Sequence, residues 1–180
     1  ASAENIEVLG FRATGKLCRG DNAFFIQNGN AFSILFSQFG INLEAGNRSG
    51  GHVEVESCHV IMDLQLPAGR CLDGTEQLIR GGVLKSANTY GWVHAAYAMP
   101  GIRDSKQLWF RKGNEILPED EDSLFEMSLS DTGPRHCVKG RVRYHLVLRQ
   151  GAWRKSLKDD FYNSNFDSVD GEVLLRVRTR

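Results

Sequence analysis

The sequence predicts an all-β protein, an antiparallel β-sandwich of the jelly-roll-like kind with disulfides. Three observations support this fold class. Apolar and polar residues alternate with a period of two in many short segments, as in strands that have one buried face. The 19 glycines fall largely between these segments, where turns are needed. Amphipathic helical periodicity is scarce, so a helical bundle or an α/β fold is not expected.

The alternation places the strands in chain order. The clearest segments are residues 31–39, 60–66, 141–149 and 172–180, and further strands are expected near 5–11, 23–28, 75–85, 90–98, 106–112 and 124–129. Only 118–126 and 154–162 are candidates for short helices. The inward parity changes between Val53 and Val55, which are odd, and Val60 and Met62, which are even. A β-bulge near 57–59 would explain that change.

The length of the chain suits one domain over residues 1–180. The 180 residues can bury a sizeable core, and no linker or internal repeat divides them. The formal net charge is zero, which gives no global argument for nucleic acid or a membrane as partner. No apolar run reaches the roughly 18 residues that span a bilayer. The chain opens Ala1-Ser2-Ala3, as after signal-peptide cleavage, although a chain trimmed for expression would also begin this way.

The four cysteines predict two disulfides in a secreted, extracellular protein. Cys18, Cys58, Cys71 and Cys137 are even in number and widely spaced, and none forms a Cys-x-x-Cys pair. Free buried thiols are the less favoured alternative. Of the three pairings, Cys58–Cys71 is disfavoured, because the turn after Leu66 would leave these residues about 25 Å apart. We predict Cys18–Cys58 with Cys71–Cys137.

No catalytic residue, cofactor or metal site is predicted. The histidines lack zinc-site spacing, and the sequence contains no nucleophile elbow, phosphate-binding loop or dinucleotide fingerprint. Acidic groups occur at 119–122, at 159–160, and at Asp167 and Asp170 beside Asn163 and Asn165. Solvated loop charge is the favoured interpretation of these groups over a calcium site. A hydrolase that uses such loop carboxylates on polysaccharide or peptide is the alternative function.

Two rows of arginines are the candidate binding residues. Arg141, Arg143 and Arg149 share one face of their predicted strand, and Arg176, Arg178 and Arg180 share one face of the last. Were the two strands adjacent, the rows would form a cationic strip for a polyanion. The favoured alternative is cross-strand ion pairing with Glu54, Glu56 and Glu172.

Two further features bear on glycans. Trp92, Tyr97, Trp109 and Trp153 could stack on sugars, although core or rim positions are expected for them in a sandwich. Asn47-Arg48-Ser49 is a glycosylation sequon in a glycine-rich loop, and it has meaning only in a host that glycosylates.

Several segments, in order, resemble domain-of-unknown-function family 4360, small secreted β-rich proteins. They are Thr14-Gly15 leading to Cys18, the strand at 32–39, the run from Cys58 to Gly69, Arg80-Gly81-Gly82 with Tyr97, Cys137, and the acidic turn at 167–171. The resemblance covers most of the chain. The chain departs from it at Lys16-Leu17, at Cys71 and in lacking a C-terminal cysteine. The resemblance implies a β fold and secretion, and no activity.

The sequence therefore favours a secreted, non-enzymatic binding or surface-associated protein. An extracellular glycan or another polyanion is the expected partner, and neither nucleic acid nor a membrane is expected. Neither the ligand nor the oligomeric state follows from the sequence.

Overall fold

The computed structural model describes residues 5–166 and 171–180, and strands dominate it. The strands are β1 (Glu7–Thr14), β2 (Ala23–Asn28), β3 (Ala31–Phe36), β4 (Gly40–Leu43), β5 (Val53–Gln65), β6 (Leu72–Lys85), β7 (Thr89–Met99), β8 (Ile102–Phe110), β9 (Leu124–Asp131), β10 (Arg141–Arg154), β11 (Tyr162–Asn165) and β12 (Glu172–Thr179). Three short 3-10 turns, η1 (Gly20–Asn22), η2 (Arg48–Gly50) and η3 (Glu121–Ser123), interrupt the connections. In the described ranges no helix is long and apolar enough to cross a membrane.

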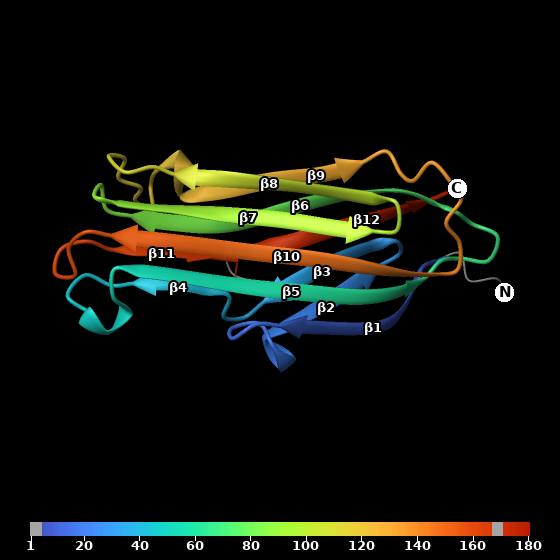
Figure 1. Cartoon of the computed structure of the whole chain (residues 1–180), viewed down its shortest axis with the longest axis horizontal. Helices are drawn as coiled ribbons and strands as arrows, with labels where there is room; N and C mark the ends of the chain where they lie inside the picture. Colours follow the sequence, from blue (N-terminus) through green and yellow to red (C-terminus); the bar gives the residue numbers. More distant parts are fainter. Residues whose placement is uncertain (1–4, 167–170) are drawn as a thin grey trace.

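The strands form two antiparallel sheets that pack face to face (Figure 1). Sheet A has the order β1-β5-β10-β7-β8. Sheet B has the order β2-β3-β12-β6-β11-β4, with β9 paired to the other edge of the long strand β6. The predicted all-β antiparallel sandwich is thus confirmed.

The core lies between the sheets and comes from alternate residues of each strand. Sheet A contributes Val60 and Met62 of β5, and Leu146 and Leu148 of β10, all fully buried. Sheet B contributes residues such as Ile34 of β3, at the parity that the sequence predicts. Because the side chains of a strand alternate between faces, the even residues of β7 point out of sheet A into solvent.

Three local expectations are wrong. Residues 118–126 contain only η3 before β9 begins, and in 154–162 a turn follows β10 and precedes β11. No bulge occurs near 57–59, because β5 pairs with β10 without a register shift from Val53 to Gln65. The parity changes because Val53 and Val55 lie on the outer face of sheet A, where their side chains are 61% and 47% exposed.

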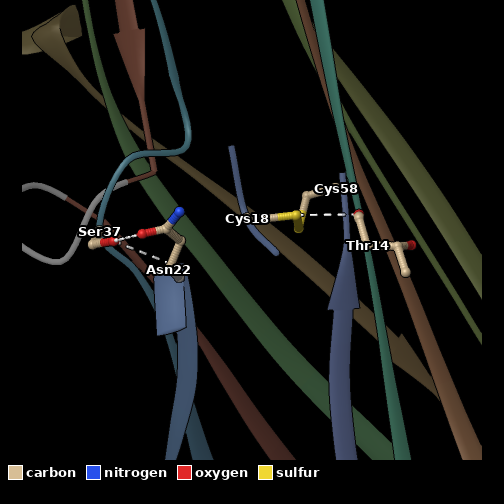
Figure 2. The surroundings of a disulfide bond; sticks show 5 residues. All are labelled: Thr14, Cys18, Asn22, Ser37 and Cys58. Atoms are coloured by element: carbon tan, nitrogen blue, oxygen red, sulfur yellow. Dashed lines mark hydrogen bonds between the residues drawn. A yellow bond between two sulfur atoms is a disulfide. The ribbon is translucent and has the colours of Figure 1, made fainter. Parts of the chain in front are cut away.

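Both predicted disulfides are present. Cys18 is bonded to Cys58, with their Cα atoms 6.0 Å apart, and Cys71 is bonded to Cys137, with Cα atoms 5.1 Å apart. The first bridge ties the turn after β1 to β5, and the carbonyl oxygen of Thr14 lies 3.2 Å from Cys18 Sγ (Figure 2). A Cβ at Gly15 would meet the Ser57 carbonyl oxygen at 2.4 Å, so the bridge needs glycine in this turn.

A buried guanidinium holds the end of the sandwich where β10 finishes. Arg154 is fully buried and donates to the carbonyl oxygens of Gly51 (2.8 Å), Glu44 (2.6 Å) and Asn47 (2.6 Å), with a longer contact to Asp160 (3.4 Å). One side chain therefore binds the loop between β4 and β5 to the end of β10.

We expect Arg154→Met to lower the free energy of unfolding by about 3 kcal/mol or more, because the variant removes the charge-assisted hydrogen bonds that the buried guanidinium donates to these carbonyl oxygens. Urea unfolding followed by circular dichroism measures this loss. The exposed neighbour Lys155 provides the matched control, and Lys155→Met should leave stability nearly unchanged. Equal stability of both variants would contradict a structural role for Arg154.

Candidate functional site

The three tryptophans of the chain come together on the outer face of sheet A. Trp153 of β10 pairs in register with Tyr90 of β7, and Trp92 of β7 pairs with Trp109 of β8. All four have the outward parity of their strands. We call Tyr90, Trp92, Trp109 and Trp153 the aromatic patch.

The rings of the aromatic patch lie close to the sheet and remain accessible. Tyr90 and Trp153 stack with their ring centroids 5.3 Å apart. A Cβ on Gly151 would meet the Trp92 indole at 2.5 Å, so this indole covers the bare backbone of β10. Trp109 is 58% exposed and Tyr90 is 40% exposed. Exposed aromatic area of this kind is typical of a binding surface.

Cations border the aromatic patch. The Arg149 guanidinium lies over the Trp92 ring, 5.8 Å from its centroid, and Lys112 Nζ lies 5.5 Å from the centroid of the Trp153 ring. Arg111 and Lys112 also line a small hollow of about 320 Å³ with Tyr90 and Trp109. The electron-rich faces of the indoles attract these cations.

A polar row and a hollow continue the surface along β7. Arg149, His94 and Gln107 are register neighbours on β10, β7 and β8, directly beside the aromatic patch. Beyond them lies a hollow of about 520 Å³, with Ala96, Ala98, Arg103, Ser105, His145 and Val147 in its lining. We call it the alanine hollow, because the small side chains of β7 leave the space open.

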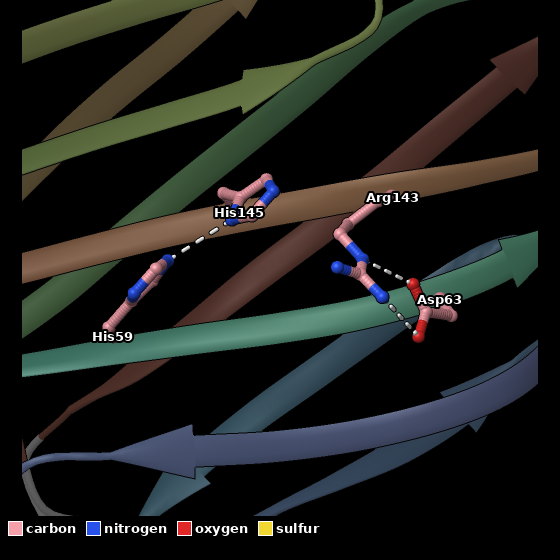
Figure 3. A network of polar contacts seen from close by, with 4 residues as sticks. All are labelled: His59, Asp63, Arg143 and His145. Carbon is pink, nitrogen blue, oxygen red and sulfur yellow. Dashed lines mark hydrogen bonds and ion pairs between the residues drawn. The ribbon is translucent and has the colours of Figure 1, made fainter.

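A polar network lies between the alanine hollow and β1 (Figure 3). The Arg143 guanidinium donates to both carboxylate oxygens of Asp63, at 2.7 and 3.3 Å, and these hydrogen bonds hold the pKa of Asp63 below its usual value. Burial, and then the neighbouring His145 and Arg12, lower the pKa of His59. His59 and His145 are in contact with each other.

The two arginine rows do not form one strip. β10 belongs to sheet A and β12 to sheet B, so Arg141, Arg143 and Arg149 lie on the opposite side of the sandwich from Arg176 and Arg178. Several of these arginines face carboxylates. Arg143 binds Asp63, Arg178 binds Glu76 at 2.6 Å, and Arg180 lies 3.5 Å from Asp73.

Glu54 and Glu56, which were expected to form ion pairs with the arginine rows, lie elsewhere in the fold. Both glutamates have the inward parity of β5. The pKa of Glu54 is raised, first by burial and then by the negative charge of Glu56. Glu172 does form an ion pair, but with Arg80 at 3.6 Å. Cross-strand pairing therefore occurs, with partners that mostly differ from those expected.

The acidic groups divide into structural and exposed ones. Asp160 is buried, and its carboxylate accepts from the Ser156 backbone N–H at 2.8 Å. Asp120 lines a cleft of about 940 Å³ between β8 and η3, together with Glu115, Glu121, Asp122 and Glu126. Asp167 and Asp170 lie outside the described residues. Within residues 5–166 and 171–180 no group of three or more His, Cys, Asp or Glu side chains could hold a metal ion.

The sequence names Trp92, Trp109 and Trp153 as residues that could stack on sugars, with core or rim positions expected for them, but it does not predict that they meet in one patch. Tyr97 is a core residue as expected, 3% exposed and packed against Tyr144. The tryptophans of the patch lie on three different strands, so their proximity depends on strand order and register. One signal was the odd parity of Val53 and Val55, which we attributed to a β-bulge. These residues instead lie exposed on the outer face of sheet A and border the patch, in register with Trp153 and Gly151.

Comparisons with known proteins give limited similarities. No protein-family model matches the chain, and no curated protein matches it either. The chain is similar to TmCBM61, solved in complex with β-1,4-galactotriose, at 9% identity and a TM-score of 0.35, covering 93% of this chain and 89% of that one.

Two other solved structures are much longer than this chain. The enzymatically active domain of tailspike protein 4 from bacteriophage CBA120 is 13% identical, with a TM-score of 0.25, and the match covers 98% of this chain and 19% of that one. The CBM22-1–GH10 modules of Clostridium thermocellum endo-1,4-β-D-xylanase 10B, complexed with xylohexaose, are 10% identical with a TM-score of 0.25, covering 97% and 26%. At these identities and TM-scores, none of the similarities assigns a ligand to this chain.

Proposed function

We propose that this chain is a secreted, non-catalytic glycan-binding protein that binds its ligand on the outer face of sheet A. The observation that carries the proposal is the convergence of all three tryptophans on one exposed patch. Tryptophan is highly buried on average, so three tryptophans on one solvent-facing surface call for a ligand.

The chemistry of the patch suits a sugar ring. One face of a pyranose can present several C–H bonds, whose partial positive charge complements the negative face of an indole. The hydroxyl groups at the ring edge then need hydrogen-bond partners, and Arg149, His94 and Gln107 lie in the adjacent row. Flat rings beside a polar row therefore match the two kinds of surface on a sugar.

The surface also fits an extended and negatively charged chain. From Tyr90 to Ala98 along β7 it runs about 26 Å, at about 3.3 Å per residue, which is room for an oligosaccharide. Arg149, Lys112, Arg111 and Arg103 border this path. We therefore propose an acidic glycan, such as one that carries carboxylate or sulfate groups.

Affinity electrophoresis through gels that contain acidic or neutral polysaccharides tests this proposal. We expect the acidic polysaccharides to retard the protein, and retardation to weaken with salt because charge contributes to binding. Arg149→Gln should reduce the retardation by acidic glycans. Arg143→Gln is the matched control and should change it less, because Asp63 already neutralises Arg143. Equal mobility in every gel would refute glycan binding.

The alternative is a hydrolase, and the cleft that contains Glu115 and Glu126 favours it over other catalytic functions. Paired carboxylates are the groups that cleave glycosidic bonds. Release of reducing ends from a glycan panel, abolished by Glu115→Gln, would establish this alternative. Secretion and membership in domain-of-unknown-function family 4360 stay predictions. The disulfides support secretion, because such bonds persist in oxidising compartments.

A further inference from the structure

Two histidines from adjacent strands meet on the outer face of sheet A, away from the aromatic patch. His59 Nε2 of β5 lies 3.2 Å from His145 Nδ1 of β10, and the two rings stack with their centroids 5.4 Å apart (Figure 3). His59 pairs in register with Val147, and His145 pairs with Ile61, so the histidines are diagonal neighbours across the ladder. Both rings are partly exposed.

The separation of the two nitrogens suits a shared metal ion. Imidazole nitrogens bind Zn²⁺ at about 2.0–2.1 Å, so two of them on one ion lie about 2.9–3.4 Å apart for ligand angles between square and tetrahedral. The observed 3.2 Å falls inside this interval. Binding requires the two side chains to rotate so that both lone pairs point toward one ion above the sheet.

We propose that His59 and His145 form a two-histidine site for a divalent transition-metal ion of the class that prefers imidazole, namely Cu²⁺, Ni²⁺ or Zn²⁺. Each ring is neutral when it binds and keeps its proton on the other nitrogen, His59 on Nδ1 and His145 on Nε2. Water completes the coordination sphere. His145 borders the alanine hollow, which gives room for these ligands.

The neighbouring charges set the expected affinity. Arg12 of β1 lies beside this pair, in register with Ile61, and its charge opposes a bound cation. Arg143 and Asp63 largely cancel each other through their paired hydrogen bonds, and Arg103 faces the hollow from β8. Because the site has only two protein ligands and lies beside an arginine, its metal affinity should be well below that of structural zinc sites. Cu²⁺ should bind more tightly than Ni²⁺ or Zn²⁺.

Isothermal titration of the tag-free chain with each metal tests the site. We expect one ion per chain, with His59→Gln and His145→Gln each weakening binding by about tenfold or more. His136→Gln is the matched control, since His136 is an exposed histidine in the loop between β9 and β10 and belongs to neither proposed site, and it should bind as the wild type does. Arg12→Gln should strengthen binding, because it removes the opposing charge.

Thermal melting first shows whether each variant is folded. Electron paramagnetic resonance of the Cu²⁺ complex provides a second measurement, with hyperfine coupling to two imidazole nitrogens expected in the wild type and lost in His59→Gln. No binding by the wild type at millimolar metal, or equal binding by His59→Gln and the wild type, would show that the histidines share only a hydrogen bond. The metal titrations contain no glycan, so their outcome does not depend on whether the proposed glycan path along β7, which includes the alanine hollow, binds a sugar.

Discussion

Trp109→Ala is expected to weaken glycan binding by about 2 kcal/mol, a factor of about 30, while the fold stays intact. The reason is that Trp109 is 58% exposed, so its ring contributes more to the surface than to the core. Gly151→Val should have a similar effect by another route. Its side chain would displace the Trp92 indole, which covers Gly151. Retardation in polysaccharide gels, converted to dissociation constants, measures both losses.

The matched control for this prediction lies on the opposite side of the sandwich. Phe24 of β2 belongs to sheet B and is 42% exposed, so Phe24→Ala removes a comparable exposed aromatic ring away from the patch. We expect wild-type glycan affinity from Phe24→Ala. Equal losses from Phe24→Ala and Trp109→Ala would mean that general hydrophobic adhesion causes the retardation.

Removal of either disulfide should lower the free energy of unfolding by about 4 kcal/mol in the chain-entropy description. The bridged cysteines are 40 and 66 residues apart in sequence, so each bridge closes a long loop in the unfolded chain. For a protein of this size the loss corresponds to a melting temperature lowered by about 8–16 °C. The paired variants Cys18→Ala/Cys58→Ala and Cys71→Ala/Cys137→Ala, followed by calorimetry, test the two bridges separately.

Removal of both bridges together should lower the free energy of unfolding by an amount that approaches the whole stability of a typical domain, which is about 5–15 kcal/mol. The paired variants avoid a practical difficulty, because Cys18 and Cys58 are fully buried and reductant reaches them poorly in the folded protein. A melting temperature that neither paired variant changes would refute the predicted contribution of the disulfides.

The fold class and much of its detail could be predicted because strand alternation is a local property. Phe32, Ile34 and Phe36 are buried together as their spacing predicts. The disulfide pairing was also predicted correctly. The short strand β11 was missed, because it includes the buried polar residue Ser164, whose hydroxyl donates to Gln150 Oε1 at 2.6 Å. Alternation of apolar side chains cannot reveal a strand that a buried hydrogen bond holds in place.

The candidate site could not be predicted, because it depends on which strands are neighbours. Arg141 and Arg176 each lie on a well-predicted strand, yet these strands belong to different sheets. His59 and His145 are separated by 86 residues and meet only through the register of β5 and β10. Sequence spacing describes one strand at a time, whereas both proposed sites are built across several.

The position of the three tryptophans also makes the chain its own optical reporter. Indole emission depends on the polarity and the charge around the ring, and Trp92 and Trp153 each have a cation against one face. A ligand that covers the aromatic patch would displace water from every emitting indole of the protein at once. Intrinsic fluorescence therefore follows events at this one surface without a label, and with little background from the rest of the molecule.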